Sequence, residues 1–205
     1  MSAATGELRK SCMRECELVA RSDGLAAGLG LALLGVDVLA VAPGRWAAVP
    51  SRQAPIGAKT RTHRLAEPEG IVFVACPGDR PQATPGLLRT GKLLAAVRLG
   101  LVRRLLDLAV EHLAGRTTGG EPLLSKQLLS GDIANVIADV ELLRVYARCQ
   151  HDLAAMAELH RQLGELGWQV TKLFGAIGYL ADYPVRALYV AVLVADTWLA
   201  GEAAQ

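Results

Sequence analysis

The chain has 205 residues, of which 52% are hydrophobic and 20% charged, and its formal net charge is +2. This composition disfavours extended disorder, and the absence of a basic block argues against nucleic-acid binding by electrostatics. The length indicates one domain, with at most a small appendage.

The first part of the chain is predicted to be mixed. Residues 5–35 are rich in alanine and leucine and are expected to be helical, with a break at Ser22-Asp23-Gly24. The runs 36–50 and 70–78 are bounded by proline and glycine, which is typical of short strands. The polar segment between them predicts loops and an edge strand near Thr62 and His63.

The most apolar run, residues 24–36, has thirteen residues. A membrane-spanning helix needs about 20. Acidic residues before this run, from Glu7 to Asp23, do not fit a secretory signal. We therefore expect a soluble, cytoplasmic protein.

From about Leu87 the pattern changes to long helices. Apolar residues recur every three or four positions in three stripes, Leu94–Leu108, Leu124–Val140 and Leu159–Leu173. A fourth segment, Pro184–Trp198, is apolar almost all round, so it must be buried between other helices or in a subunit interface. These segments predict a four-helix bundle.

The turn after the first of these helices carries a set of residues with a recognisable spacing, Arg116, Gly120, Leu123 and Gln127. It resembles the Arg-x-x-Phe-Gly-x-x-Leu turn, followed by Gln, of the acyl-CoA dehydrogenase family. Gly119 stands where that family has Phe.

The segment "LFGAIGYLADYPVR" resembles a second signature of the same family, Gln-x-x-Gly-Gly-x-Gly-Tyr followed by Tyr-Pro-Val. The matching residues are Gly175, Gly178, Tyr179, Tyr183, Pro184 and Val185. Lys172 replaces the usual Gln, and Ala176 replaces the second Gly. The resemblance covers roughly residues 87–198, and the two signatures lie at the expected separation.

The resemblance implies a mainly α fold. A C-terminal bundle of acyl-CoA dehydrogenase type, residues 86–205, would follow a small, shortened α/β region, residues 1–85. In that family FAD lies between the β-domain of one subunit and the C-terminal helices of its neighbour. The resemblance therefore implies a set of cofactor-binding residues at the turn after the first bundle helix and at the second signature. These residues are Arg116, Gln127, Lys172, Gly175, Ala176 and Gly178. Arginine suits a pyrophosphate, and glycine turns let backbone N–H groups approach one.

The glutamate base of the family has no counterpart at either of its known positions. Fifteen residues beyond Pro184 lies Leu199, followed by Ala200, and Glu202 would need a slip of three. The alternative position, at the start of the first bundle helix, falls at or near Thr90. A carboxylate is the usual base because burial can raise its pKa toward neutrality. No working catalytic residue is therefore assigned.

Other chemistry has weak support. Cys12 and Cys16 would share a helix face but lack a second pair of ligands, so no metal site is expected. His151 and His160 would lie on opposite faces of a straight helix. His63, in the polar middle segment, remains a candidate for acid–base chemistry, although a single loop histidine is more often solvated.

Two functions fit these observations. The first is an auxiliary or partner subunit in acyl-thioester oxidation, a truncated acyl-CoA dehydrogenase-like chain that shares FAD with a longer partner of the same kind. The second is a flavin-free homodimer with a repurposed acyl pocket. It would bind an acyl or polyketide-like small molecule or catalyse its cyclisation, elimination or isomerisation. A scaffold without a ligand is a third possibility.

Overall fold

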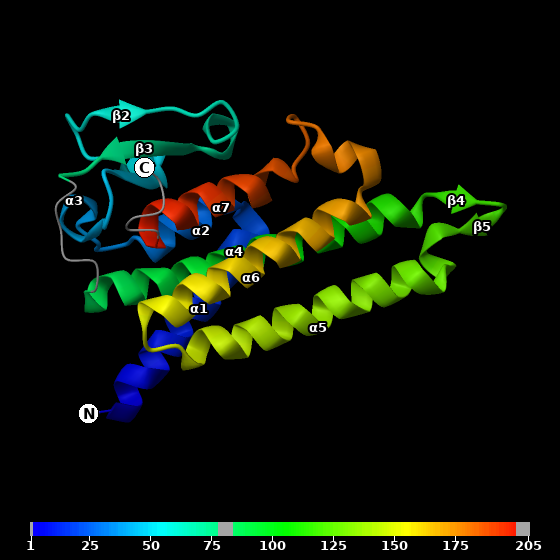
Figure 1. Ribbon diagram of the computed structural model, residues 1–205, viewed down its shortest axis with the longest axis horizontal. Helices are drawn as coiled ribbons and strands as arrows, with labels where there is room; N and C mark the ends of the chain where they lie inside the picture. Colours follow the sequence, from blue (N-terminus) through cyan, green and yellow to red (C-terminus); the bar gives the residue numbers. More distant parts are fainter. Residues whose placement is uncertain (1, 78–83, 200–205) are drawn as a thin grey trace.

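The structure is a computed structural model that describes residues 2–77 and 84–199, with side chains from residue 12 onward. Figure 1 shows long helices side by side, with a small sheet at one end and a two-stranded hairpin at the other. The helices are α1 (Ser2–Asp23), α2 (Leu25–Ala32), α3 (Val38–Val41), α4 (Pro85–Ala114), α5 (Gln127–Cys149), α6 (Leu153–Leu173) and α7 (Arg186–Leu199). The strands are β1 (Trp46–Pro50), β2 (Thr60–Arg61), β3 (Ile71–Ala75), β4 (Thr117–Thr118) and β5 (Glu121–Pro122). The predicted fold class, mainly α with a helical bundle after a small α/β region, is confirmed.

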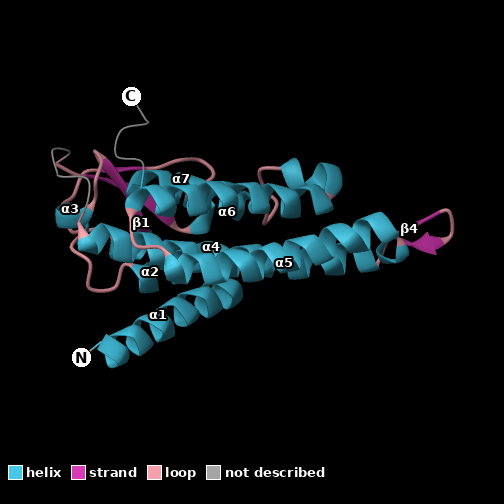
Figure 2. Cartoon of the chain, turned by 60° about the horizontal axis from the view of Figure 1, so that its bottom comes forward, coloured by secondary structure: helices cyan, strands magenta, loops and turns pink. Residues whose placement is uncertain are grey.

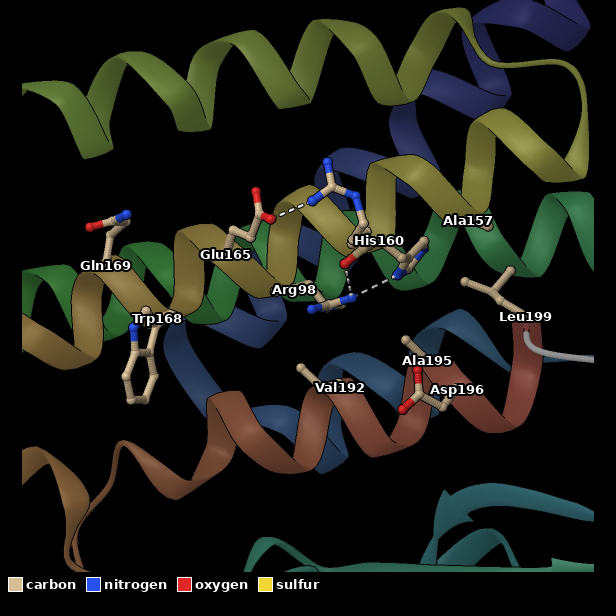
Figure 3. Close-up of a pocket in the computed structure, with 12 residues that line it drawn as sticks. Arg98, Ala157, His160, Glu165, Trp168, Gln169, Val192, Ala195, Asp196 and Leu199 are labelled. Carbon is tan, nitrogen blue, oxygen red and sulfur yellow. Dashed lines mark hydrogen bonds and ion pairs between the residues drawn. The ribbon is translucent and has the colours of Figure 1, made fainter. Parts of the chain in front are cut away.

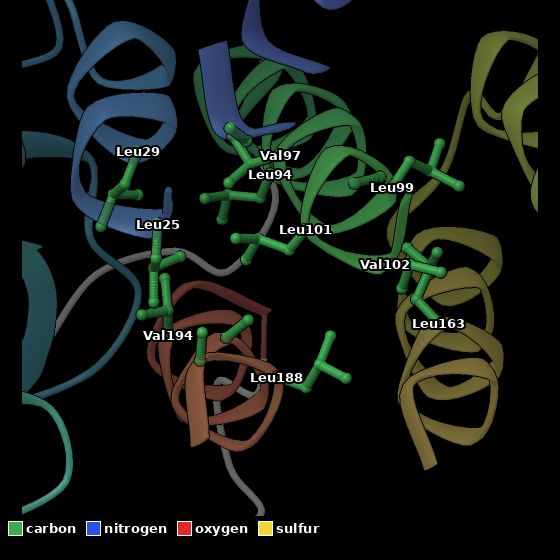
Figure 4. Close-up of a cluster of buried hydrophobic side chains, with 14 of the residues drawn as sticks. Leu25, Leu29, Leu94, Val97, Leu99, Leu101, Val102, Leu163, Leu188 and Val194 are labelled. Atoms are coloured by element: carbon green, nitrogen blue, oxygen red, sulfur yellow. The ribbon is translucent and has the colours of Figure 1, made fainter. Parts of the chain in front are cut away.

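Helix α4 is the central helix of the molecule. It begins at Pro85, where the hydroxyl of Thr84 accepts a hydrogen bond from the Leu87 N–H, a standard N-cap. It packs against α1, α2, α5, α6 and α7, and every residue from 93 to 102 is buried. Figure 4 shows Val102 facing Leu163 of α6, while Leu101 lies toward α2 and α7. The predicted stripe is therefore buried, apart from the half-buried Leu108, and so is the face that Val102 presents to α6.

Helix α5 lies at the outside of the bundle, against α4 and α6 (Figure 2). Its buried residues are Val136, Val140, Leu143 and Ala147. The predicted stripe was wrong in part: Val140 is buried and Leu124 and Ile133 are half-buried, but Leu128 is 87% exposed and Ile137 43% exposed. The helix has apolar residues on more than one face, so periodicity alone did not identify the buried one. The stripe predicted for α6, Leu159–Leu173, is buried throughout.

The N-terminal elements follow the prediction with one exception. Gly24, with φ of +90°, separates α1 from α2, as the expected break requires. The run 36–50 is not one strand, because Asp37 caps the short helix α3 by accepting a hydrogen bond from the Ala40 N–H. The strand begins only at Trp46.

The sheet has the order β1-β3-β2, and both pairings are antiparallel. β2 is an edge strand, two residues before the predicted position. Helix α7 lies between the sheet and the bundle and packs against α4, α6 and β1 (Figure 1). Burial between other elements was one of the two alternatives predicted from its apolar sequence, the other being a subunit interface, and Tyr189 remains 50% exposed. No helix in the described part of the chain combines the length and hydropathy needed to cross a membrane.

Candidate functional site

The two signature segments meet at the hairpin end of the bundle. Arg116 follows the C-terminus of α4, Gln127 begins α5, and the corner Gly175–Tyr179 follows α6 (Figure 1). Nη1 of Arg116 donates to Nε2 of His112 at 3.1 Å. The ring of His112 lies 5.8 Å from that of Phe174, the residue before Gly175. A contact chain therefore joins the α4 turn to the α6 corner.

The predicted cofactor-binding set is mostly accessible. Arg116, Gln127, Lys172, Gly175 and Ala176 are exposed, whereas Gly178 is buried. Arg116 forms no ion pair with any described residue, so its remaining N–H groups face solvent. The structure thus brings the set to one end of the bundle, with Gly178 beneath the surface.

The hairpin explains the departure at Gly119. Gly119 and Gly120 connect β4 to β5 with φ values of +59° and +81°. A two-residue hairpin turn with positive φ at both positions favours glycine twice. The Leu123 N–H donates to the carbonyl of Arg116 at 2.9 Å and closes the hairpin beside the arginine.

The glycines of the corner have different local reasons. Gly175 has φ of +62°, with open space where a Cβ would point. At Gly178 a Cβ would lie 2.6 Å from the carbonyl oxygen of Thr171, so close packing excludes any larger residue. The prediction that Pro184 begins the last helix was wrong, because α7 begins two residues later, at Arg186. The carbonyl of Pro184 accepts a hydrogen bond from the Ala187 N–H. Lys172 lies in the last turn of α6, where a cation is favourable, and lines a groove between α5 and α6 with Asp132 and Asp139.

A buried pair of polar residues was missed by the sequence reasoning. Arg98 of α4 and His160 of α6 are 5% and 6% exposed. Nη1 of Arg98 donates to Nδ1 of His160 at 3.1 Å and to its carbonyl oxygen at 2.8 Å. Nε2 of His160 lies 3.0 Å from the carbonyl oxygen of Gly91, so this nitrogen carries the proton. The imidazole is neutral, because burial, together with the nearby Arg98 charge, lowers its pKa to about 3.

This pair lies in a groove of about 630 Å³ between α6 and α7 (Figure 3). Burial lowers the pKa of Arg98 to about 10, so the guanidinium is still charged at neutral pH. Asp196 of α7 lies on the facing wall, and burial raises the pKa of its carboxyl. Two signals pointed to the pair. Arg98 interrupts the apolar run LLAAVRLGLV, and His160 follows Met156 by four residues and precedes Leu163 by three, on the buried side of α6.

A sequence-family model, the acyl-CoA dehydrogenase C-terminal domain, matches residues 84–162. The chain is thus similar to that domain over α4, α5 and the first part of α6. The match includes the first signature, with Arg116 and Gln127, and ends before the second. A comparison with curated protein sequences finds no match.

Solved structures share the acyl-CoA dehydrogenase fold. An acyl-CoA dehydrogenase from Mycobacterium smegmatis is 19% identical, with a TM-score of 0.53 over 70% of this chain and 46% of that one. A glutaryl-coenzyme A dehydrogenase is 22% identical, with a TM-score of 0.51 over 75% of this chain and 46% of that one. The ChsE4-ChsE5 complex from Mycobacterium tuberculosis gives 19% identity and 0.51 over 72% and 46%. The chain thus spans under half the length of each of these structures, and at such identities the likeness is one of fold.

The positions that would hold an acyl-CoA dehydrogenase base have no carboxylate in the part of the chain described. Thr90 is buried, and its hydroxyl donates to the carbonyl of Gly86 at 3.0 Å within α4. Leu199 ends α7 and lines the α6–α7 groove. Ala200 and Glu202 lie outside the described residues. The nearest carboxylate on α7 is Asp196, about one helical turn before Leu199.

Proposed function

We propose that this chain is an auxiliary subunit in acyl-thioester oxidation. Its hairpin end contributes contacts to FAD that is shared with a longer acyl-CoA dehydrogenase-like chain. The observation that carries the proposal is Arg116, an exposed arginine with no ion pair among the described residues, joined through His112 to the Gly175 corner.

The chemistry of this end suits a flavin nucleotide. A guanidinium can donate two parallel hydrogen bonds to a pyrophosphate, and such charge-assisted bonds are the strong ones. Arg116 uses one nitrogen on His112 and has others to offer. At Gly175 nothing lies within 4 Å of the space a Cβ would occupy, so a second molecule can approach the backbone there. Gln127 adds an exposed amide at the start of α5.

A partner chain would also cover apolar surface beside this corner. Trp168, Tyr179, Leu180 and Tyr189 are each at least 50% exposed. They line one groove beside α6, the corner and α7, and the rings of Trp168 and Tyr179 meet edge to face at 5.5 Å. Exposed apolar patches of this kind mark interaction sites. Among the structural neighbours, ChsE4-ChsE5 is an assembly of two named chains, and a similar pairing is proposed here.

In this arrangement the catalytic carboxylate comes from the partner. The residues at the two base positions, Thr90 and Leu199, cannot take up a proton from a substrate carbon. When bound, FAD would supply the redox chemistry, and this chain would hold and orient it.

The test is FAD binding by the chain alone and in complex with a longer acyl-CoA dehydrogenase-like chain of the same organism. We expect no stoichiometric FAD on the isolated chain, and FAD with its visible flavin absorbance in the complex. Arg116→Ala in the complex should weaken FAD binding about 10- to 100-fold, the loss expected for hydrogen bonds to a charged group.

The matched control is Arg89→Ala. Arg89 is exposed near the other end of the same helix, so this variant should bind FAD as the wild type does. Equal FAD affinity for Arg116→Ala and the wild type would contradict the proposed role. Stoichiometric FAD on the isolated chain would contradict the need for a partner.

A second candidate function is favoured by one observation. The groove between α6 and α7 contains a buried cation and a perturbed histidine, as expected for a repurposed pocket. A flavin-free homodimer acting on an acyl or polyketide-like substrate would use such a groove. Binding of FAD in the heteromeric complex with loss in Arg116→Ala would decide for the first candidate.

A further inference from the structure

The groove between α6 and α7 has an apolar lining with a cation at its base. Small and aliphatic residues line it from both helices, with Gly164 on α6 and Val192, Ala195 and Leu199 on α7. Trp168 lies at one end (Figure 3). Ligand sites commonly combine an apolar wall with few polar groups in a volume of several hundred Å³, and this groove measures about 630 Å³.

Only one nitrogen of the Arg98 guanidinium forms hydrogen bonds with described residues. Nη1 makes both hydrogen bonds to His160. Nε and Nη2 have no hydrogen-bond partner among the described residues, and neither nitrogen is fully buried. These two nitrogens are adjacent on the guanidinium, and together they form the edge that pairs side-on with a carboxylate.

The unused edge is directed into the groove rather than into packed protein. Nη2 lies 3.4 Å from the position that a Cβ on Gly164 would take, and Gly164 lines the groove. A glycine inside a helix is less favourable than an alanine, and here it leaves the guanidinium open on this side. Figure 3 shows Arg98 between α6 and α7, with Asp196 opposite.

The charges near Arg98 leave it incompletely neutralised. His160 is neutral, and Asp196 makes no hydrogen bond or ion pair with Arg98 in the described part of the chain. At the rim, Arg161 is already paired with Glu158 and Glu165. A buried cation without a contacting anion is costly, so an anion that enters the groove is favoured.

We propose that this groove binds an organic carboxylate with an apolar body, whose two oxygens pair with Nε and Nη2 of Arg98. The apolar body lies along α7 between Val192 and Leu199. Asp196 repels the incoming anion, so it limits the affinity rather than contributing to it. This site is separate from the hairpin end and depends on neither flavin nor a partner chain.

The test is equilibrium binding of octanoate to the purified chain, measured by calorimetry and by the change in fluorescence of Trp168. Octanamide is the neutral control, with the same apolar chain. We expect octanoate to bind at least about tenfold more tightly than octanamide, because hydrogen bonds to charged groups are the stronger ones. Equal affinities would overturn the proposal.

Three variants localise the binding. Arg98→Met should remove the preference for octanoate over octanamide. Arg161→Met, the matched control at the rim, should retain it. Asp196→Asn removes the repulsion at an exposed position of α7 and should tighten octanoate binding by at least about twofold. This last variant keeps the proposal testable if Arg98→Met fails to fold.

Two results would contradict the assignment. If Asp196→Asn weakens octanoate binding, Asp196 is an acceptor for the ligand and the carboxylate assignment is wrong. If inorganic phosphate competes with octanoate at equal affinity, the apolar wall contributes nothing and the site is a general anion site. Because the assay contains no flavin, its failure would leave the proposed function at the hairpin end untouched.

Discussion

The neutral imidazole of His160 provides a hydrogen-bond acceptor for the buried Arg98 at the middle of the bundle. Arg98 lies in a stretch of α4 that is buried on all sides, so its donors need acceptors inside the protein. Nδ1 and the carbonyl of His160 supply two, and the Gly91 carbonyl accepts the proton on Nε2. Nη1 of Arg98 and both ring nitrogens of His160 keep these hydrogen bonds only if the imidazole remains unprotonated at Nδ1.

Stability should therefore fall as the solution becomes acidic. The unfolded chain protonates this imidazole below about pH 6.5, whereas the folded chain does so only near pH 3. Falling pH thus favours the unfolded state throughout this window, by at most about 1.4 kcal/mol per pH unit. Urea unfolding at a series of pH values measures the slope. His160→Gln, which cannot titrate, should reduce it.

The control for this experiment is His151→Gln. His151 is exposed before the start of α6, so its replacement should leave the pH slope as in the wild type. If His160→Gln keeps the wild-type slope, the imidazole of His160 is not held neutral in the folded protein.

Single residues show where prediction from sequence reached its limit. The signature residues Arg116 and Gly175 could be placed at one end of the bundle, because their spacing resembles a known family. Arg98 and His160 could not be paired, because they are 62 positions apart in sequence and meet only through helix packing. A polar residue in an apolar run indicates a buried group that requires a hydrogen-bond partner, but the sequence does not show which residue that partner is.

At the scale of helices, α1 and α4 approach each other closely at one glycine. A Cβ on Gly100 would lie 2.2 Å from the carbonyl oxygen of Glu17 and 3.0 Å from Cβ of Ala20. The backbone of α1 therefore rests directly on α4. This contact covers a side of α4 that lies outside the predicted stripe Leu94–Leu108.

Gly100→Ala should push these helices apart. We expect a loss of about 1–3 kcal/mol in the free energy of unfolding, the usual range for overpacking. Gly131→Ala is the matched control, because Gly131 lies inside α5 with nothing within 4 Å of a new Cβ. That variant should gain up to about 1 kcal/mol from helix propensity. Denaturant unfolding measures the free energy of unfolding of both variants. If Gly100→Ala is as stable as the wild type, α1 does not pack this closely against α4.

Helix registers were predictable only where one face dominates. In α6 the spacing of Leu159–Leu173 is regular, and the structure buries all of it. In α5 the helix contacts neighbours on one side only and has apolar residues on several, so the sequence did not decide between faces. The break in the run 36–50 depended on a single capping residue, Asp37.

At the scale of the whole molecule, α7 joins the small sheet to the bundle. Ala48 of β1 faces Phe73 of β3, and its own N–H and C=O are directed away from the sheet. The hydroxyl of Thr197 accepts from the Ala48 N–H at 3.0 Å, and the indole N–H of Trp198 donates to the Ala48 carbonyl at 2.9 Å. A second link is the ion pair of Arg186 with Glu69 at 2.7 Å.

These hydrogen bonds satisfy the free edge of β1, which would otherwise be an unpaired strand edge. The sequence predicted both the strand and the apolar helix, but not that the helix would complete the strand. That arrangement depends on two polar atoms, the Thr197 hydroxyl oxygen and the Trp198 indole nitrogen, near the end of a mostly apolar helix. The sheet and the bundle therefore share one hydrophobic core, which runs from Cys16 to Trp198.

Replacement of Thr197 tests this junction. Thr197→Val keeps the shape but leaves the buried Ala48 N–H without its acceptor, at a cost of about 1–3 kcal/mol in the free energy of unfolding. Thr197→Ser retains the hydroxyl and should lose less. Hydrogen exchange of the Ala48 amide separates local from global effects. It should become faster in Thr197→Val, relative to the amides of α4, and remain protected in Thr197→Ser. Wild-type protection of this amide in Thr197→Val would show that another group satisfies β1, and that α7 does not hold the sheet in this way.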